Sequence, residues 1–577
     1  MAEHDLVVRG GTVVDGTGTE PRAADVAVRD GRVVEVGRVA GRGHRELDAD
    51  GLVVAPGFVD IHTHYDGQAI WDGRLWPSSW HGVTTAVMGN CGVGFAPCRP
   101  EHREMLVRLM EGVEDIPGAV LSEGLEWRWE TFPEYLDALE QRPHDIDFAT
   151  QVPHGALRVY AMGERGANRE PATAADRALM AKVARESVQA GALGFSTSRT
   201  LNHRTSDGQP TPTLTAAEDE LLEIAMALAE ADAGVLQVVS DFRDPEGELG
   251  MLQRIVKRSG RPLSVSLVQN DRHPLMYRKL LSMIAQASAD GLPIKAQVCG
   301  RAVGIVLGLD TSLNPFSDKP LYRELSRLPI GERCARLRDP AVREKLFARE
   351  RAPHGFAAAV LHNWANMFPL EETPDYEPTR EQSIAARAAA RGMTPQDVAL
   401  DFMLERAGRG LLYVPFLNYS TGSFEPLLEM LRHPDTLPGL GDGGAHVGMI
   451  CDGSFPTHLL THWTRDRSRG ERLTLPWVIE AQAARTARAL GLHDRGVLAP
   501  GYRADLNLID YDRLRLLAPE VVADLPAGGK RLLQRAEGYL ATVVRGEVVY
   551  ENGEPTGALP GRLIRGAQPA PIASTAL

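Results

Sequence analysis

The chain has 577 residues, enough for a full eight-stranded α/β barrel together with a smaller second domain. Hydrophobic residues make up 43% and charged residues 24%, which are ordinary proportions for a globular enzyme. The net charge of −13 argues against nucleic acid or an anionic membrane as a partner and leaves a small-molecule substrate. No apolar run is as long as a membrane span, and the acidic N-terminus has no signal-peptide core, so we expect a cytoplasmic protein. The oligomeric state stays open, a homo-oligomer included.

Short β-strands are predicted at both ends of the chain. Near the N-terminus, glycine and aspartate turn signals separate apolar runs at residues 6–8, 12–14, 26–28 and 33–36. Matching runs near the C-terminus are residues 506–509, 541–544 and 547–550. Neither group has enough strands to bury a sheet face alone, so we expect one small β-sandwich built from residues 1–55 and 496–577. Its last part, from residue 560, is predicted to be a loosely held tail.

The middle of the chain, residues 56–495, alternates apolar strand-like runs with helical patterns. This alternation is typical of a parallel (β/α)8 barrel of the TIM type. Clear helices are predicted over residues 175–190 and 216–233, the second with Thr215 as its N-cap and Glu218 at the capping-box position. The segment near residues 315–394 does not suit a minimal barrel, so we expect an insertion over the barrel mouth.

Candidate metal ligands stand where predicted barrel strands end. One apolar run ends in His62 and His64, whose i, i+2 spacing points both side chains to the same side of a strand. Two imidazoles so placed can grip a divalent metal at ~2.0–2.1 Å; the alternative is two ordinary polar residues where a strand becomes a loop. Cys91 follows the strand at residues 84–88, and Asp442 lies in a glycine-rich segment. The active site of a parallel barrel lies at the C-terminal ends of its strands, where these residues would meet.

Four segments carry a resemblance to a known family. Residues 56–64 (PGFVDIHTH) resemble the entry of amidohydrolase-superfamily enzymes into their first barrel strand. Residues 83–92 (VTTAVMGNCG) are similar to the N-acyl-D-amino-acid deacylase, or D-aminoacylase, branch. Residues 441–446 (GDGGAH) resemble the end of the last barrel strand, and residues 500–506 (PGYRADL) the return into the second domain. The resemblance implies a metal-dependent hydrolase of C–N amide bonds other than peptide bonds, with an N-acyl-D-amino acid as the leading substrate class.

The resemblance also implies roles for particular residues. The ligands for one or two zinc ions would be His62, His64, Cys91 and Asp442. Asp442 would in addition be the catalytic base that takes the proton of the attacking water, and His446 would stand behind the ligands or contact the leaving group. A carboxylated lysine bridging two metals is not expected, because the first lysine of the chain, Lys182, falls on the solvent face of a predicted helix.

The chain departs from the family pattern on its fifth and sixth strands. The deacylases place one histidine ligand at the end of each, but residues 234–241 and 263–269 contain no histidine. The lysine that helps to grip the substrate carboxylate falls near Gln269. Replacement ligands are sought among the loop histidines His154, His203 and His273, with His203 preferred because it follows a strand-like run.

Three residues are candidates for substrate binding, namely Arg199, His203 and His446. Arg199 is the first choice for a substrate carboxylate, because a planar guanidinium suits bidentate capture.

Two alternative functions stay open. Hydrolysis of cyclic amides, imides or another C–N substrate on the same fold is favoured by the missing lysine. A metal-poor barrel that binds a small molecule without turnover is favoured by the missing strand histidines, although the retained ligand set argues against it.

Overall fold

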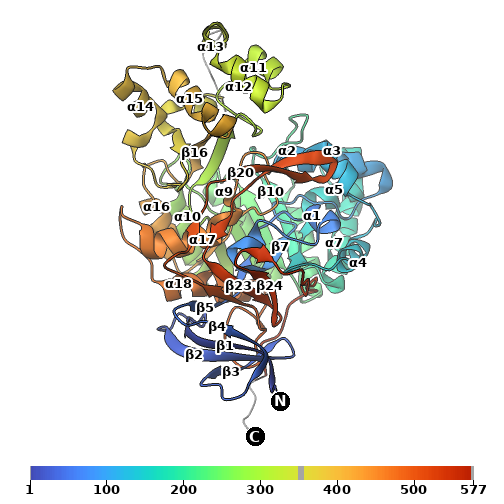
Figure 1. Ribbon diagram of the computed structural model, residues 1–577. Coiled ribbons are helices and arrows are strands. Elements are labelled where there is room, and N and C mark those ends of the chain that lie inside the picture. Colours follow the sequence, from blue (N-terminus) through green and yellow to red (C-terminus); the bar gives the residue numbers. More distant parts are fainter. Residues whose placement is uncertain (1, 349–356, 573–577) are drawn as a thin grey trace.

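The computed structural model describes residues 2–348 and 357–572 and shows an α/β protein with parallel and antiparallel sheets (Figure 1). This observation confirms the predicted α/β class. Within the two described ranges, every helix is too short or too polar to cross a membrane.

Parallel strands form the centre of the molecule. One sheet has the order β6 (Phe58–Asp60), β7 (Val83–Met88) and β8 (Asp147–Thr150). The other has the order β17 (Thr436–Pro438), β13 (Ile294–Val298), β12 (Leu263–Ser266), β11 (Val235–Ser240), β10 (Gly194–Arg199) and β9 (Val152–Pro153), again with parallel pairings throughout. The two sheets adjoin at both sides, because one residue separates β8 from β9 and Thr63 beyond β6 bridges Gly443 beyond β17.

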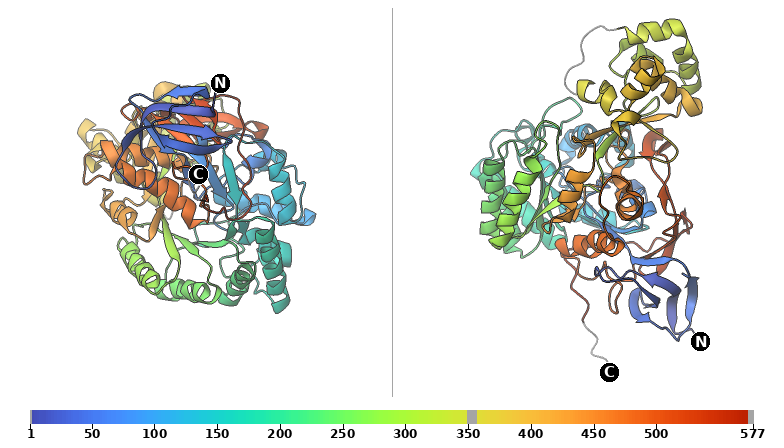
Figure 2. Two further views of the ribbon diagram at one scale, coloured as in Figure 1. Left: turned by 90° about the horizontal axis from the view of Figure 1, so that it is seen from below. Right: turned by 90° about the vertical axis from the view of Figure 1, so that its left-hand side faces the viewer.

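Helices cover the outside of these strands, as Figures 1 and 2 show. All residues of β7, β8 and β12 are buried, as expected for parallel strands enclosed by helices. The covering helices are α2 (Arg103–Glu114), α3 (Gly118–Gly124), α4 (Phe132–Glu140), α5 (His154–Met162), α7 (Ala174–Ala190), α8 (Glu218–Glu230), α9 (Pro245–Ser259), α10 (Met276–Ala289), α16 (Glu425–Arg432), α17 (Phe455–Thr461), α18 (Leu475–Glu480) and α19 (Thr486–Ala489).

The two predicted helices are present, but one cap was wrong. Helix α7 begins with a capping box, in which Thr173 and Asp176 each accept a hydrogen bond from the other's backbone N–H. Helix α8 begins at Glu218 after Ala217, and no side chain caps it. The predicted N-cap, Thr215, instead donates to the carbonyl of Arg169, because the chain makes a turn before the helix starts.

Strands from both ends of the chain pair in one sheet. Its order is β25 (Glu554–Pro555), β24 (Glu547–Glu551), β23 (Tyr539–Val544), β18 (Leu506–Ile509), β5 (Val53–Pro56), β1 (His4–Val13), β2 (Arg22–Arg29) and β3 (Arg32–Gly37), and β4 (Gly43–Asp48) pairs with β1. The junction between the two ends is the antiparallel pair β5–β18. The prediction of a loose tail was wrong for the stretch around Leu563 and Ile564, which are buried, with Leu563 bridging Phe148.

A lobe between β13 and β17 projects away from the N-terminal strands β1–β4 (Figures 1 and 2). It has its own hydrophobic core, to which Ile305, Leu337 and Met403 belong. Its elements are β14 (Val303–Gly308), α11 (Pro320–Leu325), α12 (Ile330–Arg338), α13 (Pro340–Phe347), β15 (Phe368–Leu370), α14 (Ile384–Arg391), α15 (Pro395–Gly408) and β16 (Leu411–Leu417). The predicted insertion at 315–394 falls within this segment, and its residues 349–356 lie outside the described residues.

Candidate metal centre

Two histidines leave strand β6 side by side. His62 and His64 are both buried, and their ring centroids lie 5.4 Å apart. The backbone N–H of His62 donates to the Asp60 carboxylate (3.1 Å), while that of His64 donates to the carbonyl of Gly443 (2.8 Å). The end of the first parallel strand is thereby attached to the loop that follows the last one.

Cys91 brings a sulfur atom to the same place from the end of β7. Its φ of +54° lies in the left-handed region, so the chain turns sharply here. Its backbone N–H donates to Gln237 Oε1 on β11 (2.9 Å), and its Sγ lies 3.2 Å from His62 Nε2. The ligand atoms of His62, His64 and Cys91 all lie within 4.8 Å of one another.

Asp442 completes the cluster from the loop after β17. Its backbone N–H donates to the carbonyl of His62 (3.0 Å), and its Oδ1 lies 3.5 Å from His62 Nε2 and 3.6 Å from His64 Nε2. The following glycine is required by close packing, since a Cβ on Gly443 would lie 2.6 Å from the hydroxyl oxygen of Tyr65. The carboxylate therefore stands between the two imidazoles and stays 17% exposed.

The electrostatics of the cluster favour a bound cation. Burial lowers the pKa of His62 to about 4 and raises that of the Cys91 thiol to about 11. Burial also opposes ionisation of Asp442, but hydrogen bonding from His64 and the charges of His62, His64 and His446 outweigh it and lower its pKa. Burial opposes protonation of His64, but the charge of Glu114 and hydrogen bonding with Asp442 and Cys91 outweigh it and raise its pKa. Neutral His62 and ionised Asp442 are in metal-binding forms, whereas a bound cation would displace the protons of His64 and of the Cys91 thiol.

Buried amides and hydroxyls hold His62 from behind. Its Nδ1 donates to Gln297 Oε1 on β13 (2.6 Å), and the amide nitrogen of Gln297 donates to Ser264 Oγ on β12 (2.6 Å). This chain of hydrogen bonds leaves the lone pair of Nε2 facing Cys91 and Asp442. Such a backing partner fixes the tautomer of a metal-ligating histidine.

Strands β11 and β12 contribute hydrogen-bonding side chains to the surroundings of the cluster. Both strands run where they were predicted, and neither carries a histidine. Gln237 of β11 accepts the hydrogen bond of the Cys91 backbone, while Ser264 of β12 supports Gln297. These strands thus support the cluster with neutral groups and offer it no imidazole.

Glu114, the last residue of α2, was not anticipated from the sequence. Its side chain is 1% exposed, and Oε1 lies 3.3 Å from His64 Nδ1 while Oε2 lies 3.6 Å from His446 Nε2. No sequence signal marks it, because the end of an amphipathic helix is an ordinary place for a glutamate.

The predicted substrate-binding residues are placed differently from one another. His203 is held by Ser198 (Oγ to Nδ1, 3.0 Å), and its pKa falls to about 3 because of burial and then the nearby charges of His446 and His64. His446 lies beside the cluster, with Nε2 3.6 Å from the Glu114 carboxylate that faces His64. Arg199 instead forms an ion pair with Glu248, so its guanidinium is already matched with a carboxylate.

The other candidates lie elsewhere. His154 uses both ring nitrogens, with Thr197 and Glu220 as partners at 2.8 Å each, and offers no free lone pair to a metal. Lys182 is 61% exposed, as predicted, next to Glu186.

The donor set of this cluster fits zinc. Two imidazole nitrogens, one sulfur and one carboxylate oxygen are ligands that zinc takes at ~2.0–2.3 Å, and a tetrahedral site spaces such atoms about 3.3–3.8 Å apart. The distances of 3.5 and 3.6 Å from Asp442 Oδ1 to the two Nε2 atoms fall within that range, and the 3.2 Å between His62 Nε2 and Cys91 Sγ lies just below it. The other ring nitrogen of His64, the buried Nδ1, makes no hydrogen bond and faces the Glu114 carboxylate, so Nε2 is the atom that faces the cluster.

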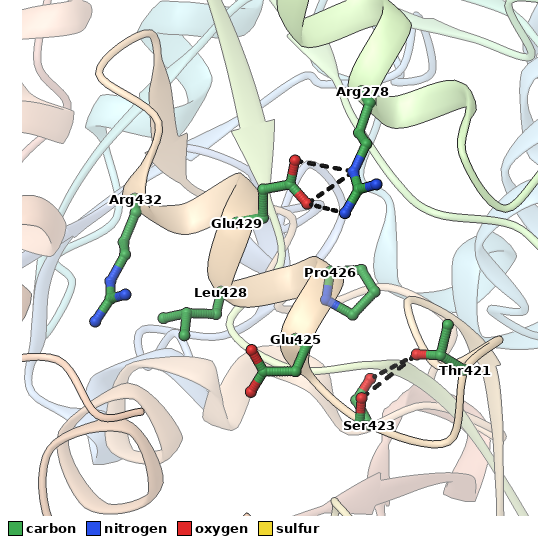
Figure 3. A pocket seen from close by; sticks show the side chains of 8 residues that line it. All are labelled: Arg278, Thr421, Ser423, Glu425, Pro426, Leu428, Glu429 and Arg432. Atoms are coloured by element: carbon green, nitrogen blue, oxygen red, sulfur yellow. Dashed lines mark hydrogen bonds and ion pairs between the residues drawn. The ribbon is translucent and has the colours of Figure 1, made fainter. Parts of the chain in front are cut away.

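A separate pocket of about 390 Å³ lies on the surface beside α10 and α16 (Figure 3). Arg278 and Glu429 form an ion pair at its edge (2.9 Å), with Thr421 and Ser423 opposite. It holds none of the cluster residues and no histidine or cysteine. Its size alone does not make it a catalytic site.

Comparison with known proteins agrees with this geometry. The model of the amidohydrolase family matches residues 45–550. The chain is 28% identical to a D-aminoacylase of Alcaligenes xylosoxydans xylosoxydans, over 97% of each chain, and 28% identical to an N-acyl-D-aspartate deacylase of the same organism, over 98% of this chain and 95% of that one. The structure of N-acyl-D-glutamate deacylase from Bordetella bronchiseptica, complexed with zinc and a phosphonate inhibitor, covers 97% of this chain and 99% of that one, with a TM-score of 0.63 and 23% identity.

The family match and the full-length deacylase relatives show a hydrolase that acts on carbon–nitrogen bonds other than peptide bonds. The chain belongs to the amidohydrolase family, which confirms the resemblance found in its sequence motifs.

Proposed function

We propose that this protein is a zinc-dependent deacylase of N-acyl-D-amino acids or of closely related amides. The observation that carries the proposal is the convergence of His62, His64, Cys91 and Asp442 from three separate strand ends. The names of the relatives supply the substrate class: two of them are deacylases of N-acyl-D-amino acids that cover nearly the whole chain.

The proposal includes the finer architecture. We infer that the two parallel sheets form one (β/α)8 barrel over residues 56–495, interrupted by the lobe near 315–394. Residues 1–55 and 496–577 would form the β-sandwich. We further propose that the protein binds one or two zinc ions, is cytoplasmic, and acts on a small molecule without nucleic acid or membrane partners. Its oligomeric state stays open.

Each residue of the cluster has a distinct task in this reaction. When bound, zinc supplies Lewis-acid polarisation of the scissile carbonyl and acidifies water. Asp442 accepts the proton of the attacking water on its carboxylate and passes it to the leaving nitrogen. Its lowered pKa keeps the carboxylate ionised, which is the form that can accept a proton. We infer that His446, which pairs with Glu114 beside the cluster, and His203 would contact the leaving group or the substrate.

A second candidate is the hydrolysis of cyclic amides or imides. Gln269 favours it, because its side chain donates to the carbonyl of Pro274 and accepts from the backbone of Ser420, and so provides no cation for a substrate carboxylate. Arg199 is neutralised by Glu248 as well.

The test is a substrate panel with enantiomeric pairs. Purified zinc-loaded protein is assayed for amine release from N-acetyl-D- and N-acetyl-L-amino acids, and for ring opening of a hydantoin and a dihydropyrimidine. The proposal expects turnover of the D-acyl compounds well above their L counterparts. Ring opening without deacylation would establish the second candidate, and no turnover of any amide by zinc-loaded protein would contradict both.

A further inference from the structure

Glu114 is a carboxylate buried at the inner end of helix α2, next to the metal cluster. Its side chain is only 1% exposed, so it is almost completely shielded from solvent. Glutamate is rarely so buried without a positively charged partner. Among the described residues its ion pairs are with His64 and His446 alone, and neither arginine nor lysine takes part.

The two oxygens of Glu114 face two different histidines. Oε1 lies 3.3 Å from His64 Nδ1, on the opposite side of the ring from Nε2, which faces Asp442 at 3.6 Å. His64 Nδ1 makes no hydrogen bond, and its close polar neighbour is Glu114 Oε1 in the ion pair. Oε2 lies 3.6 Å from His446 Nε2.

The next residue fixes Glu114 in this position. Asp115 adopts a left-handed φ of +53° and ends α2. Its carboxylate accepts hydrogen bonds from Ser312 Oγ (2.8 Å) and from the backbone N–H of Gly448 (3.1 Å). Asp115 thus ties the helix end to the base of the lobe and to the loop that carries His446, which leaves Glu114 little freedom to move away.

We propose that Glu114 is the positioning residue that orients His64 toward the metal and keeps His446 beside it; this inference rests on the proposed function. If His64 held the metal through Nε2, its remaining proton would reside on Nδ1, which faces Glu114 Oε1. A carboxylate in this place fixes the ring orientation and makes the imidazole a stronger ligand. Gln297 takes the corresponding place behind His62 with a neutral amide, so of these two histidines only His64 has a charged group behind it.

This role has added weight in a chain without histidines on β11 and β12. The metal must be held mainly by residues that follow β6, β7 and β17. The metal affinity therefore depends more strongly on the orientation of each of these ligands. Glu114 is not placed on a barrel strand, and it reaches the cluster only because α2 ends there.

The experiment measures zinc affinity directly. Zinc is removed from the full-length protein with a chelator and titrated back against a chromophoric competitor, for the parent, Glu114→Gln, Glu114→Asp and Glu104→Gln. Glu104 is the matched control, an exposed glutamate on the same helix. Thermal unfolding of the metal-free forms checks that each variant is folded, and cobalt substitution reports the cysteine–metal charge-transfer band.

The inference expects Glu114→Gln to weaken zinc binding about 10- to 100-fold. The cobalt–thiolate band should persist at saturating metal, Glu114→Asp should recover part of the affinity, and Glu104→Gln should match the parent. An affinity of Glu114→Gln within about threefold of the parent would overturn it. So would the loss of one of two bound metals, which would make Glu114 a ligand. If the parent itself bound no zinc, the proposed function would fail together with this inference.

Discussion

Replacing Asp442 by asparagine separates proton transfer from metal binding. The backbone of residue 442 has a φ of +48°, a conformation that asparagine adopts more readily than most residues, and its N–H bond to the His62 carbonyl does not involve the side chain. The loop should therefore keep its shape. An amide oxygen can still stand where Oδ1 lies 3.5 Å from His62 and 3.6 Å from His64, but the amide cannot accept the proton of water.

The expected loss follows from the role of a general base. Such assistance is worth about 10²–10⁴ in rate, or about 3–5 kcal/mol of activation free energy. Asp442→Asn should thus lower kcat by two to four orders of magnitude while it retains much of its zinc. The assay measures kcat on an N-acetyl-D-amino acid and the zinc content of the same sample.

A matched control tests whether replacing aspartate by asparagine at a left-handed backbone position lowers kcat by itself. Asp232 also has a left-handed φ, +46°, and its side chain is 95% exposed on the surface, so Asp232→Asn should leave kcat unchanged. Near-parental kcat in zinc-loaded Asp442→Asn would refute the role of Asp442 as the base. His446 or His203 would then be the residue to examine.

Further predictions concern the ligands and one distant ion pair. The purified protein should carry one to two zinc ions per chain, and a chelator should abolish turnover that added zinc restores; full activity in metal-free protein would contradict this. His64→Ala should abolish turnover with the fold nearly intact, as judged by circular dichroism, because the ligand lies at strand ends and not in the core. Cys91→Ser should remove the cobalt–thiolate band that the parent shows, and a persistent band would exclude Cys91 as a ligand. Burial opposes ionisation of Glu377, but His462 and Arg467 outweigh it and lower its pKa from 4.5 to about 2. The contacts of Glu377 with His462 and Arg467 therefore contribute about 3 kcal/mol of stability above pH 4.5, and this contribution is lost as the pH falls toward 2. In Glu377→Gln, the free energy of unfolding measured in urea should depend less on pH over that range.

Part of this site could be predicted because the sequence spacing of some residues determines where their side chains point. Side chains spaced i, i+2 in an extended run point to the same side, and the rings of His62 and His64 lie 5.4 Å apart just beyond strand β6. Cys91 and Asp442 each followed another predicted strand, and parallel strands bring their C-terminal ends together. The positions of strands β11 and β12, and the absence of histidine from them, could be seen in the sequence for the same reason.

Other parts depend on contacts between distant residues and could not be predicted. Glu114 enters the site because α2 ends beside His64, 50 positions earlier in the chain, and nothing in its neighbouring residues requires that. Arg199 appeared available for a carboxylate, but Glu248, brought near by the β11–α9 turn, already occupies its guanidinium. Gln297 is an unremarkable amide in sequence and becomes the partner of His62 only in the folded chain.

The central claim is that His62, His64, Cys91 and Asp442 hold the metal at which the amide is hydrolysed. The most direct measurement is anomalous diffraction at the zinc edge from crystals of the zinc-loaded protein. The account predicts a zinc peak ~2.0–2.1 Å from His62 Nε2 and His64 Nε2, ~2.0–2.2 Å from the Asp442 carboxylate and ~2.3 Å from Cys91 Sγ. A crystal with zinc bound elsewhere and these four side chains without metal, in protein that still hydrolyses the amide, would contradict it.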